Sequence, residues 1–453
     1  MKTKFNYFYI FIITLLISLL IFGYLLNKRS SASKKNEISN ILQQLKTRNI
    51  QISKIQKNLF KNGKNINDLI NEKKINFKKV FENKELANFK EYSSSKYTTN
   101  DILFNGNRGA IGTGFIDFYN NDQNLFLVTY DGIFAYARMN NLQNFEKINS
   151  NINSLIQYEK FYFHDQYGIK DILIDEKTLY VSYIGKRKDN CYDLKIISAK
   201  LNEEYLNFQI FYETSSCVDV NNSHGFYPAQ GAGGRIIKLD NSSLLFTTGD
   251  FRNRPLAQDL ASDFGKILKI NTQNKKSDVI SIGHRNPQGL YYSKKFNFII
   301  STEHGPKGGD EVNINLKPFK KIKNFGWPVS SYGEHYYKAY SKKILQEAPL
   351  NKSHKKYGFA EPIKYFVPSI GISQIIPLNK DETKFLIGAM GNEIQDQDLG
   401  LHLILLNEKR QKVIEHNYTL LNERVRDIIV SKDKKTVIIF LETSSSLLIL
   451  ERI

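Results

Sequence analysis

The sequence predicts an all-β fold of the β-propeller class, preceded by a membrane-spanning helix and a basic helical stalk. Short apolar runs bounded by Asn, Asp and Gly recur from Thr98 to the C-terminus, with no convincing long helix between them. A long uncharged run stands at the N-terminus, and a Lys-rich stretch separates it from the apolar runs. The 453-residue chain also exceeds the length that one hydrophobic core usually serves, so two domains or one repeat-built domain are expected.

The N-terminal run, Phe5 to Leu26, contains 22 residues without a charge. At about 1.5 Å per residue, a helix of this length crosses the roughly 30 Å hydrocarbon core of a bilayer. A cleaved signal peptide is the alternative. However, the run is longer than the apolar part of most signal peptides, and the best cleavage site after it, Ser31-Ala32-Ser33, is poor. Residues 1–27 are therefore expected to form an uncleaved anchor.

The net charge of +19 is concentrated after this anchor. Residues 28–96 contain 17 Lys and Arg against 6 Asp and Glu, which gives +11, whereas residues 97–453 contain 45 basic and 39 acidic residues, which gives +6. Apolar residues at helical spacing predict a helical stalk over 28–96. They are Ile38, Ile41, Leu42, Leu45, Leu69, Ile70, Val80 and Phe81. A nucleic-acid-binding face would normally lie on the folded domain, so no nucleic-acid partner is expected.

The propeller is predicted to occupy residues 97–453, where apolar runs mark the strands. Among them are residues 124–130, 178–183, 243–248, 298–301, 385–387, 436–441 and 447–450. Sequence repeats among these runs are weak, so their spacing does not give the number of blades. A pair of β-sandwiches is the alternative arrangement.

The two cysteines, Cys191 and Cys217, both fall in this predicted β domain. Their separation is compatible with a single disulfide in an oxidising compartment, and two unpaired buried thiols are the alternative. The charges around the anchor indicate the opposite location. By the positive-inside rule, Lys28, Arg29 and the lysines that follow would keep the C-terminal side in the cytoplasm.

Three polar segments rich in Gly and Pro carry the residues best suited to chemistry. They read GHRNPQGL at 283–290, EHGPKGGDEVN at 303–313 and NFGWP at 324–328. Arg285 and Asn286 could hold a ligand with several negative charges. Turns in the second segment could direct carbonyl oxygens toward a hard cation, with carboxylates nearby. The residues concerned are Gly305, Pro306, Asp310 and Glu311. Taken alone, these segments could equally be ordinary tight turns.

In their order, the three segments resemble those of soluble glucose dehydrogenases and aldose sugar dehydrogenases, the glucose/sorbosone dehydrogenase family. Further motifs extend the resemblance from about residue 110 to the C-terminus: GGRI at 233–236, TTGD at 247–250, FGKI at 264–267 and ERVRD at 423–427. The resemblance implies a six-bladed β-propeller that uses pyrroloquinoline quinone (PQQ) and Ca²⁺. It also implies oxidation of a sugar at its anomeric carbon, by proton removal and hydride transfer to PQQ, with calcium as Lewis acid.

The resemblance also assigns roles to individual residues. Arg285 and Asn286 match the pair that contacts the quinone, where Arg285 would stabilise negative charge on an oxygen of the cofactor. Arg424 and Arg426 match two arginines that pair with PQQ carboxylates, a task that suits planar guanidinium groups. The family's cofactor-binding lysine has no clear counterpart in GAMGNE at 388–393.

The calcium site is implied by the same resemblance. Gly305 and Pro306 match the residues whose backbone carbonyl oxygens hold the ion, and Asp310 or Glu311 would lie close to it.

One departure from the family concerns the catalytic base. The family has a histidine a few residues before the Gly-Arg pair, but here residues 228–235 read PAQGAGGR. Gly231 or, with a shifted gap, Gln230 takes that place, and neither accepts a proton near neutral pH. Asp250, which would orient the histidine, is present. His224 lies upstream and is a candidate base if the loop is rearranged. Loss of a general base typically costs about 10²–10⁴-fold in rate, so weak activity could persist with Asp250 or water as the proton acceptor.

Three functions follow from these observations. The first is a PQQ-dependent aldose dehydrogenase with an altered site. The motifs identify neither its sugar substrate nor its electron acceptor. The second is a propeller that binds cofactor or sugar as a sensor without turnover, and the third is a structural surface protein. The resemblance favours a single-pass inner-membrane protein whose propeller lies in the periplasm or another extracytoplasmic space.

Overall fold

The computed structural model describes residues 73–99, 113–158, 161, 167–187, 190–219, 230–336, 341–391 and 394–453. All of them belong to one unit of the chain, Ile52–Ile453. No helix among these residues is both long and apolar enough for a bilayer span. The predicted anchor at residues 1–27 and the stalk up to residue 72 lie outside the described residues.

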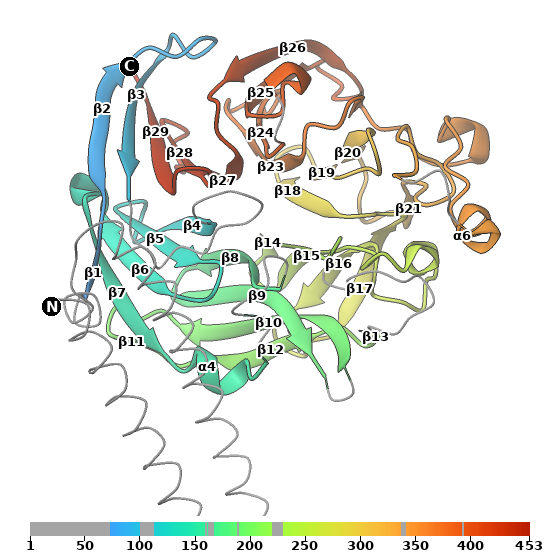
Figure 1. Cartoon of the computed structure of the whole chain (residues 1–453), viewed down its shortest axis with the longest axis horizontal. Coiled ribbons are helices and arrows are strands. Elements are labelled where there is room, and N and C mark those ends of the chain that lie inside the picture. Colours follow the sequence, from blue (N-terminus) through green and yellow to red (C-terminus); the bar gives the residue numbers. More distant parts are fainter. Residues whose placement is uncertain are drawn as a thin grey trace, which may run out of the picture. The chain divides into compact units, whose positions relative to one another are not determined.

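Six sheets, called blades 1 to 6 here, make up the described fold (Figure 1); their pairs are antiparallel except β7 with β11 and β17 with β21. Blade 1 consists of β1 (Lys74–Asn76), β4 (Gly114–Tyr119), β5 (Asn124–Thr129), β6 (Phe134–Arg138), β7 (Asn144–Ser150) and β11 (Tyr205–Leu206). Blade 2 consists of β8 (Ile169–Asp175), β9 (Thr178–Lys186), β10 (Cys191–Lys200), β12 (Gln209–Glu213) and β13 (Val218–Asp219). Blade 3 consists of β14 (Gly233–Asp240), β15 (Ser243–Thr248), β16 (Lys266–Asn271), β17 (Ser277–Ile282) and β21 (Lys323–Asn324).

The second half of the chain forms the remaining blades. Blade 4 consists of β18 (Pro287–Ser293), β19 (Phe298–Glu303), β20 (Asp310–Asn315) and β22 (Lys364–Phe366). Blade 5 consists of β23 (Ile372–Pro377), β24 (Lys384–Ala389), β25 (Gly400–Leu406) and β26 (Val413–Leu420). Blade 6 consists of β2 (Lys78–Lys84), β3 (Tyr92–Thr98), β27 (Val425–Val430), β28 (Thr436–Leu441) and β29 (Ser446–Arg452). Two short helices, α4 (Ile152–Leu155) and α6 (Lys342–Glu347), lie in connections.

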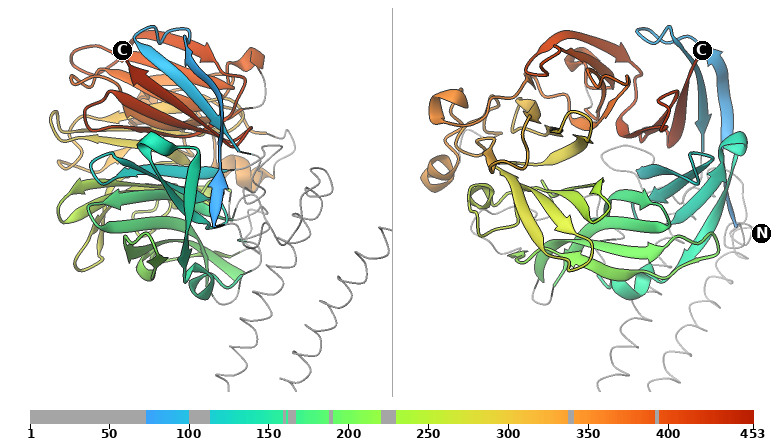
Figure 2. Two further views of the ribbon diagram at one scale, coloured as in Figure 1. Left: turned by 90° about the vertical axis from the view of Figure 1, so that its left-hand side faces the viewer. Right: turned by 180° about the vertical axis from the view of Figure 1, so that it is seen from behind.

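The innermost strands of the blades form a closed ring. Neighbours pack in the order β4, β8, β14, β18, β23 and β27, and β27 packs against β4 again, as Figures 1 and 2 show. The apolar strands bury their side chains between adjacent blades; the side chains of β5, for example, are all buried. The prediction of a six-bladed propeller is therefore confirmed, and the β-sandwich alternative is excluded.

The helical stalk prediction is wrong for residues 74–96, which contain β1, β2 and most of β3 of the propeller. Val80 and Phe81, placed in a helical stripe, lie in β2. β2 pairs with β3, and β3 pairs with the last strand of the chain, Tyr92 standing opposite Arg452. The propeller thus begins before residue 97. The partner strand lies more than 300 residues away, so the local spacing of apolar residues gave no sign of it.

Cys191 and Cys217 form a disulfide, with their Cα atoms 5.5 Å apart. Cys191 opens β10 and Cys217 directly precedes β13, which pairs with β10. Of the two alternatives that the sequence left open, the disulfide is the one formed.

Two stacked histidines in blade 5 predict a pH dependence of stability. His402 is fully buried; its Nε2 donates to the carbonyl oxygen of Gln397 at 2.8 Å, and its Nδ1 lies 2.9 Å from Nε2 of His416. Burial lowers the pKa of His402 to about 3. An unfolded histidine titrates near pH 6.5, so below that pH only the unfolded state gains this proton.

The free energy of unfolding should therefore fall as the pH drops from 6.5 toward 3, by about 1.4 kcal/mol per pH unit from His402. Urea denaturation at several pH values measures this slope. His402→Gln cannot titrate and should flatten the slope. An equally steep slope in that variant would contradict the assignment.

Candidate active site

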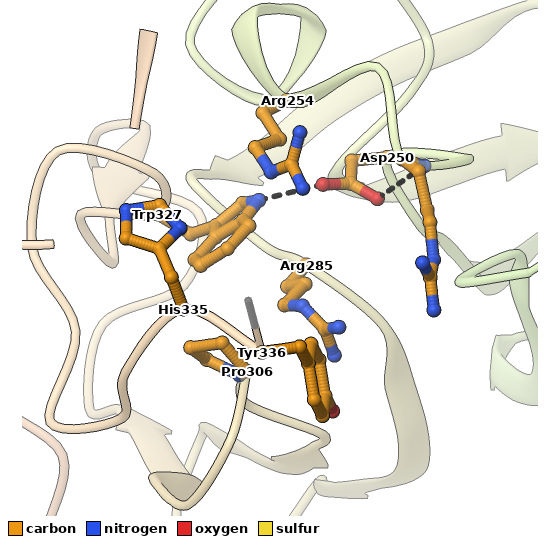
Figure 3. A pocket seen from close by; sticks show the side chains of 8 residues that line it. Asp250, Arg254, Arg285, Pro306, Trp327, His335 and Tyr336 are labelled. Carbon is orange, nitrogen blue, oxygen red and sulfur yellow. Dashed lines mark hydrogen bonds between the residues drawn. The ribbon is translucent and has the colours of Figure 1, made fainter. Parts of the chain in front are cut away.

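An open pocket, with about 320 Å³ of space that includes solvent at its mouth, collects residues from four of the predicted segments (Figure 3). Its lining comprises Asp250, Arg252, Arg254, Arg285, Pro306, Trp327, His335 and Tyr336. They follow strands β15, β17 and β19 or lie beyond β21, so connections between strands of blades 3 and 4 supply them. Asp250, Arg285 and Pro306 were predicted from the motifs, and the structure brings these three together.

Asp250 is the carboxylate of the pocket. One carboxylate oxygen accepts a hydrogen bond from the indole Nε1 of Trp327 at 2.7 Å, and the other accepts from the backbone N–H of Arg252 at 2.7 Å. Burial raises the pKa of Asp250, and the guanidinium groups of Arg285 and Arg254 oppose that rise. A buried carboxylate with a raised pKa in a pocket is the kind of group that serves as a general base.

Gly231, one of the two residues predicted to take the place of the family's histidine, lies directly beside Asp250. A Cβ atom placed on Gly231 would be 3.2 Å from Oδ1 of Asp250, and the residue has a φ of +72° that favours glycine. The backbone N–H of Phe251 donates to the carbonyl oxygen of Gly231 at 3.1 Å, which fixes this proximity. His224 lies outside the described residues, so its role stays a prediction.

Arg285 is held against the turn that was predicted to bind calcium. Its Nη1 donates to the carbonyl oxygens of His304 and Gly305, at 2.9 and 2.5 Å. The guanidinium carbon lies 5.4 Å from the centre of the Trp327 ring and 6.0 Å from that of Tyr336. The Gly305 carbonyl oxygen, which was predicted to bind calcium, therefore already accepts a hydrogen bond from Arg285.

The two carboxylates among the predicted metal ligands, Asp310 and Glu311, face away from each other. Asp310 accepts hydrogen bonds from the backbone N–H groups of Gly305 and Ile372, at 3.0 and 2.9 Å, and so fixes the turn. Glu311 lies 3.1 Å from Nε2 of His354. Consecutive residues of a strand point to opposite faces, so the two carboxylates serve different surroundings. Among the described residues, no group of three or more His, Cys, Asp or Glu side chains could hold a metal ion.

Arg424 and Arg426 share a buried carboxylate, Glu442, which directly follows β28. Nε of Arg424 donates to one oxygen of Glu442 and Nε of Arg426 to the other, both at 2.6 Å. Nη1 of Arg424 also donates to the carbonyl oxygens of Met390 and Gly391. Within the described part of the chain, Glu442 is the one hydrogen-bonding partner of Arg426, so its Nη groups can receive another carboxylate.

The carbonyl oxygen of His304 accepts a hydrogen bond from Arg285. Burial lowers the pKa of His304, the charge of Asp310 opposes this, and the charges of Arg285 and Arg426 lower the pKa further. Its Nε2 is buried and has no hydrogen-bond partner among the described residues. Asn286 lies beside this region and accepts hydrogen bonds from the backbone N–H of Gly233 and from Gln288, at 3.0 and 2.9 Å.

Several site residues were not predicted as such. Arg252 and Arg254 lie just after the TTGD motif. Two arginines so close to the motif aspartate could have indicated that both belong to the site. Trp327 is the only tryptophan of the chain and belongs to the NFGWP motif. Glu442 was also detectable, as a single carboxylate at the end of the apolar run TVIIFL. His335 and Tyr336 gave no local signal.

The chain is similar to several known proteins. The family model for glucose / sorbosone dehydrogenase matches residues 123–449. The aldose sugar dehydrogenase YliI of Escherichia coli (strain K12) is 29% identical over 236 residues, covering 48% of this chain and 58% of the relative. The quinoprotein glucose dehydrogenase B of Acinetobacter calcoaceticus is 30% identical over 128 residues, covering 24% of this chain and 25% of the relative. The chain thus matches little more than half the length of the first relative and a quarter of the second.

A solved structure supports the fold. The soluble aldose sugar dehydrogenase of Escherichia coli, in its apo-form, superimposes with a TM-score of 0.62 at 20% identity. The superposition covers 80% of this chain and all of that one. Both chains therefore share the propeller.

Proposed function

Because the chain belongs to the glucose/sorbosone dehydrogenase family, we propose that it is a PQQ-dependent dehydrogenase that oxidises an aldose at the anomeric carbon. The observation that carries this proposal is the convergence of Asp250, Arg285 and Pro306 on one pocket with an aromatic wall. Motifs far apart in the sequence supply these residues, and a purely structural propeller has no physical need to gather them.

The residues fit the charge of the cofactor. PQQ is a tricarboxylate, and Arg285 and Arg426 are two of the arginines that the family resemblance assigns to it; Arg285 lines the pocket and Arg426 is held by Glu442. The Nη groups of Arg426 would hold a carboxylate of PQQ, and Arg285 would face a second polar edge of it. When bound, PQQ supplies the acceptor for the hydride of the sugar.

Asp250 is the proposed proton acceptor. Its carboxylate lines the pocket beside Gly231, where no side chain intervenes. It would take the proton of the anomeric hydroxyl while the C1 hydride leaves, so that the aldose becomes a lactone. Trp327 holds the carboxylate in place through its Nε1 hydrogen bond. His224 is the competing candidate for this role.

Calcium belongs to the proposal through the family resemblance, but the residues as arranged do not fit the ion. The Gly305 carbonyl oxygen already accepts a hydrogen bond from Arg285, so a cation could bind there only after that guanidinium moved. No step of the proposed reaction is derived through calcium.

We also propose that residues 5–26 anchor the protein in a membrane with the propeller on the extracytoplasmic side. The Cys191–Cys217 disulfide supports this, because disulfides persist in oxidising compartments. Protease added to spheroplasts should degrade the propeller while leaving a cytoplasmic marker intact. Protection of both would contradict the orientation.

The cofactor proposal is tested by binding, with Trp327 as the probe. PQQ added to the cofactor-free protein should quench the fluorescence of this single tryptophan in a saturable way. Arg426→Gln should raise the dissociation constant by about 10–100-fold, because a charge-assisted hydrogen bond contributes about 1.5–3 kcal/mol. Arg452→Gln, which changes an exposed arginine paired with Glu91, is the matched control and should leave it unchanged.

The absence of saturable quenching would contradict a PQQ site. Saturable binding without oxidation of any aldose, measured with an artificial electron acceptor, would instead favour the sensor function. The sequence prediction that Gly231 or Gln230 replaces the family's catalytic histidine is the reason for considering this second function.

A further inference from the structure

Lys266, in the FGKI motif at 264–267, is a fully buried lysine. Its Nζ donates hydrogen bonds to the carbonyl oxygens of Leu256, Ala257 and Phe264, at 2.7, 3.3 and 2.5 Å. Among the described residues, the hydrogen-bond acceptors of this group are all carbonyl oxygens. An ammonium group has three N–H donors, so each of them is used. Because lysine is almost never buried to this extent unless it is paired, its place in the fold requires an explanation.

The three carbonyl groups lie on the connection between β15 and β16, which supplies Asp250 and other residues to the pocket. Two of them belong to the end of the short 3₁₀ helix η3 (Arg254–Ala257), and the third lies just before β16. Gly265 permits this close return of the chain, because a Cβ atom there would lie 2.6 Å from Cα of Ala257. The ammonium of Lys266 thus holds the two parts of the connection together.

The same turn holds the segment that carries Arg285. The carbonyl oxygen of Ala257 also accepts a hydrogen bond from the backbone N–H of Gly283 at 2.9 Å. The carbonyl oxygen of Gly265 accepts one from the backbone N–H of His284 at 3.2 Å. The backbone just before Arg285 is therefore bound to a residue that Lys266 contacts and to the residue that precedes Lys266.

The backbone beside Asp250 and the wall formed by Trp327 are held in the same way. The N–H of Gly265 donates to the carbonyl oxygen of Gly249 at 2.9 Å. Gln258, which follows η3, donates through its Nε2 to the carbonyl oxygen of Trp327 at 2.6 Å. Figure 3 shows the carboxylate of Asp250 next to the indole of Trp327, whose Nε1 it binds. A shift of the residues around Lys266 would therefore reach the carboxylate and the indole.

These contacts depend on the proton of Lys266. Burial lowers its pKa to about 8, and the negative charges of Asp259 and Asp263 oppose this. The group is therefore an ammonium at neutral pH. A neutral amine has only two N–H donors and a lone pair, so above pH 8 one of the three carbonyl oxygens would lose its donor.

We propose that Lys266 is a positioning residue of the active site, whose ammonium acts as an internal cation that holds the β15–β16 connection and, through it, Asp250, Arg285 and Trp327. The identity of the reaction that these residues serve rests on the proposed function. The positioning itself does not, because it is read from contacts within the protein. The inference goes beyond the proposed function in assigning a role to a residue that does not line the pocket.

Fluorescence of the full-length, cofactor-free protein tests the positioning. Trp327 is the single tryptophan and is only 6% exposed, so acrylamide should quench it weakly at pH 7. Quenching should increase toward pH 9 with a midpoint near pH 8, where Lys266 loses its proton. Lys266→Met keeps the length of the side chain without its donors, and its quenching should be stronger at pH 7 and should not change up to pH 9. Lys276→Met, at an exposed lysine between β16 and β17, is the matched control and should behave as the wild type.

Steady-state rates of the PQQ-loaded protein test the consequence for the reaction. Lys266→Met should lower kcat/KM for the aldose by about 100-fold, because a misplacement of about 1 Å away from the chemistry can cost that much. In the wild type kcat/KM should decline above pH 8, and this alkaline limb should be missing in Lys266→Met. Far-UV circular dichroism shows whether the variant is folded. If it is not, the quenching titration of the wild type decides alone.

Three outcomes would overturn the inference: wild-type quenching that does not change between pH 7 and pH 9, a pH-dependent increase that survives in folded Lys266→Met, or an unchanged kcat/KM in that variant. Failure of the proposed function looks different. A Lys266-dependent change in quenching in a protein that oxidises no aldose would support the positioning role and contradict the dehydrogenase.

Discussion

Replacing Asp250 by asparagine should lower kcat for aldose oxidation by about 10²–10⁴-fold, the range typical for removal of a general base. Asparagine is nearly isosteric and can still accept a hydrogen bond from Trp327, so the loss would reflect proton transfer more than shape. Steady-state rates of the PQQ-loaded protein with an artificial electron acceptor measure it. Asp259→Asn, a change at an exposed aspartate of the same connection, is the matched control and should retain full activity.

The pH profile separates the base from a merely structural carboxylate. The hydrogen bond from Trp327 lowers the pKa of Asp250, because it favours the charged form. Trp327→Phe removes that donor, so the pKa should rise and the acidic limb of kcat/KM should shift to higher pH. An unmoved limb in Trp327→Phe, or a rate loss in His224→Gln that Asp250→Asn does not show, would assign the base elsewhere.

The strands and the order of the site motifs could be predicted because they depend on local sequence. Apolar runs such as 243–248 are buried on both faces in a propeller, so composition alone identifies them. The error at residues 74–96 has the opposite cause. β2 is mostly exposed, and its pairing is decided by β3 and, through β3, by the C-terminal strand β29.

Site residues were predicted where a motif fixes the backbone, and missed where the contact is made between neighbouring strands. Gly305 and Pro306 lie in the turn that their residue types require. By contrast, the partner of Arg424 and Arg426 is Glu442, and no spacing rule links this carboxylate to the arginines. Asp310 and Glu311 were treated as equivalent ligands, although the alternation of strand side chains already placed them on opposite faces.

Some motifs that identify the family serve the fold and not the site. Arg235, in the GGRI motif, is buried in β14, where its Nη1 donates to Asp171 of β8 and to Asp427 of β27 at 2.6 and 2.8 Å. Its Nε donates to the carbonyl oxygen of Gln288 in β18 at 3.0 Å. Asp427, from the ERVRD motif, also accepts from the backbone N–H of Ile116 in β4. One arginine therefore links the inner strands of five blades.

Arg235→Leu should lower the free energy of unfolding by about 3–5 kcal/mol, because it leaves Asp171 and Asp427 buried without their cation. Urea denaturation followed by circular dichroism measures this. Arg452→Gln, which breaks an exposed pair with Glu91, should cost about 1 kcal/mol or less.

A second variant distinguishes charge from packing at this position. In the background of Arg235→Leu, replacing both Asp171 and Asp427 by asparagine removes the unpaired charges while the cavity and lost contacts remain. If the penalty is electrostatic, stability should recover by more than half, since a neutral amide costs much less to bury than an unpaired carboxylate. No recovery would mean that Arg235 acts through packing and its bond to Gln288, and a loss below about 1 kcal/mol in Arg235→Leu itself would contradict its role as the link between blades.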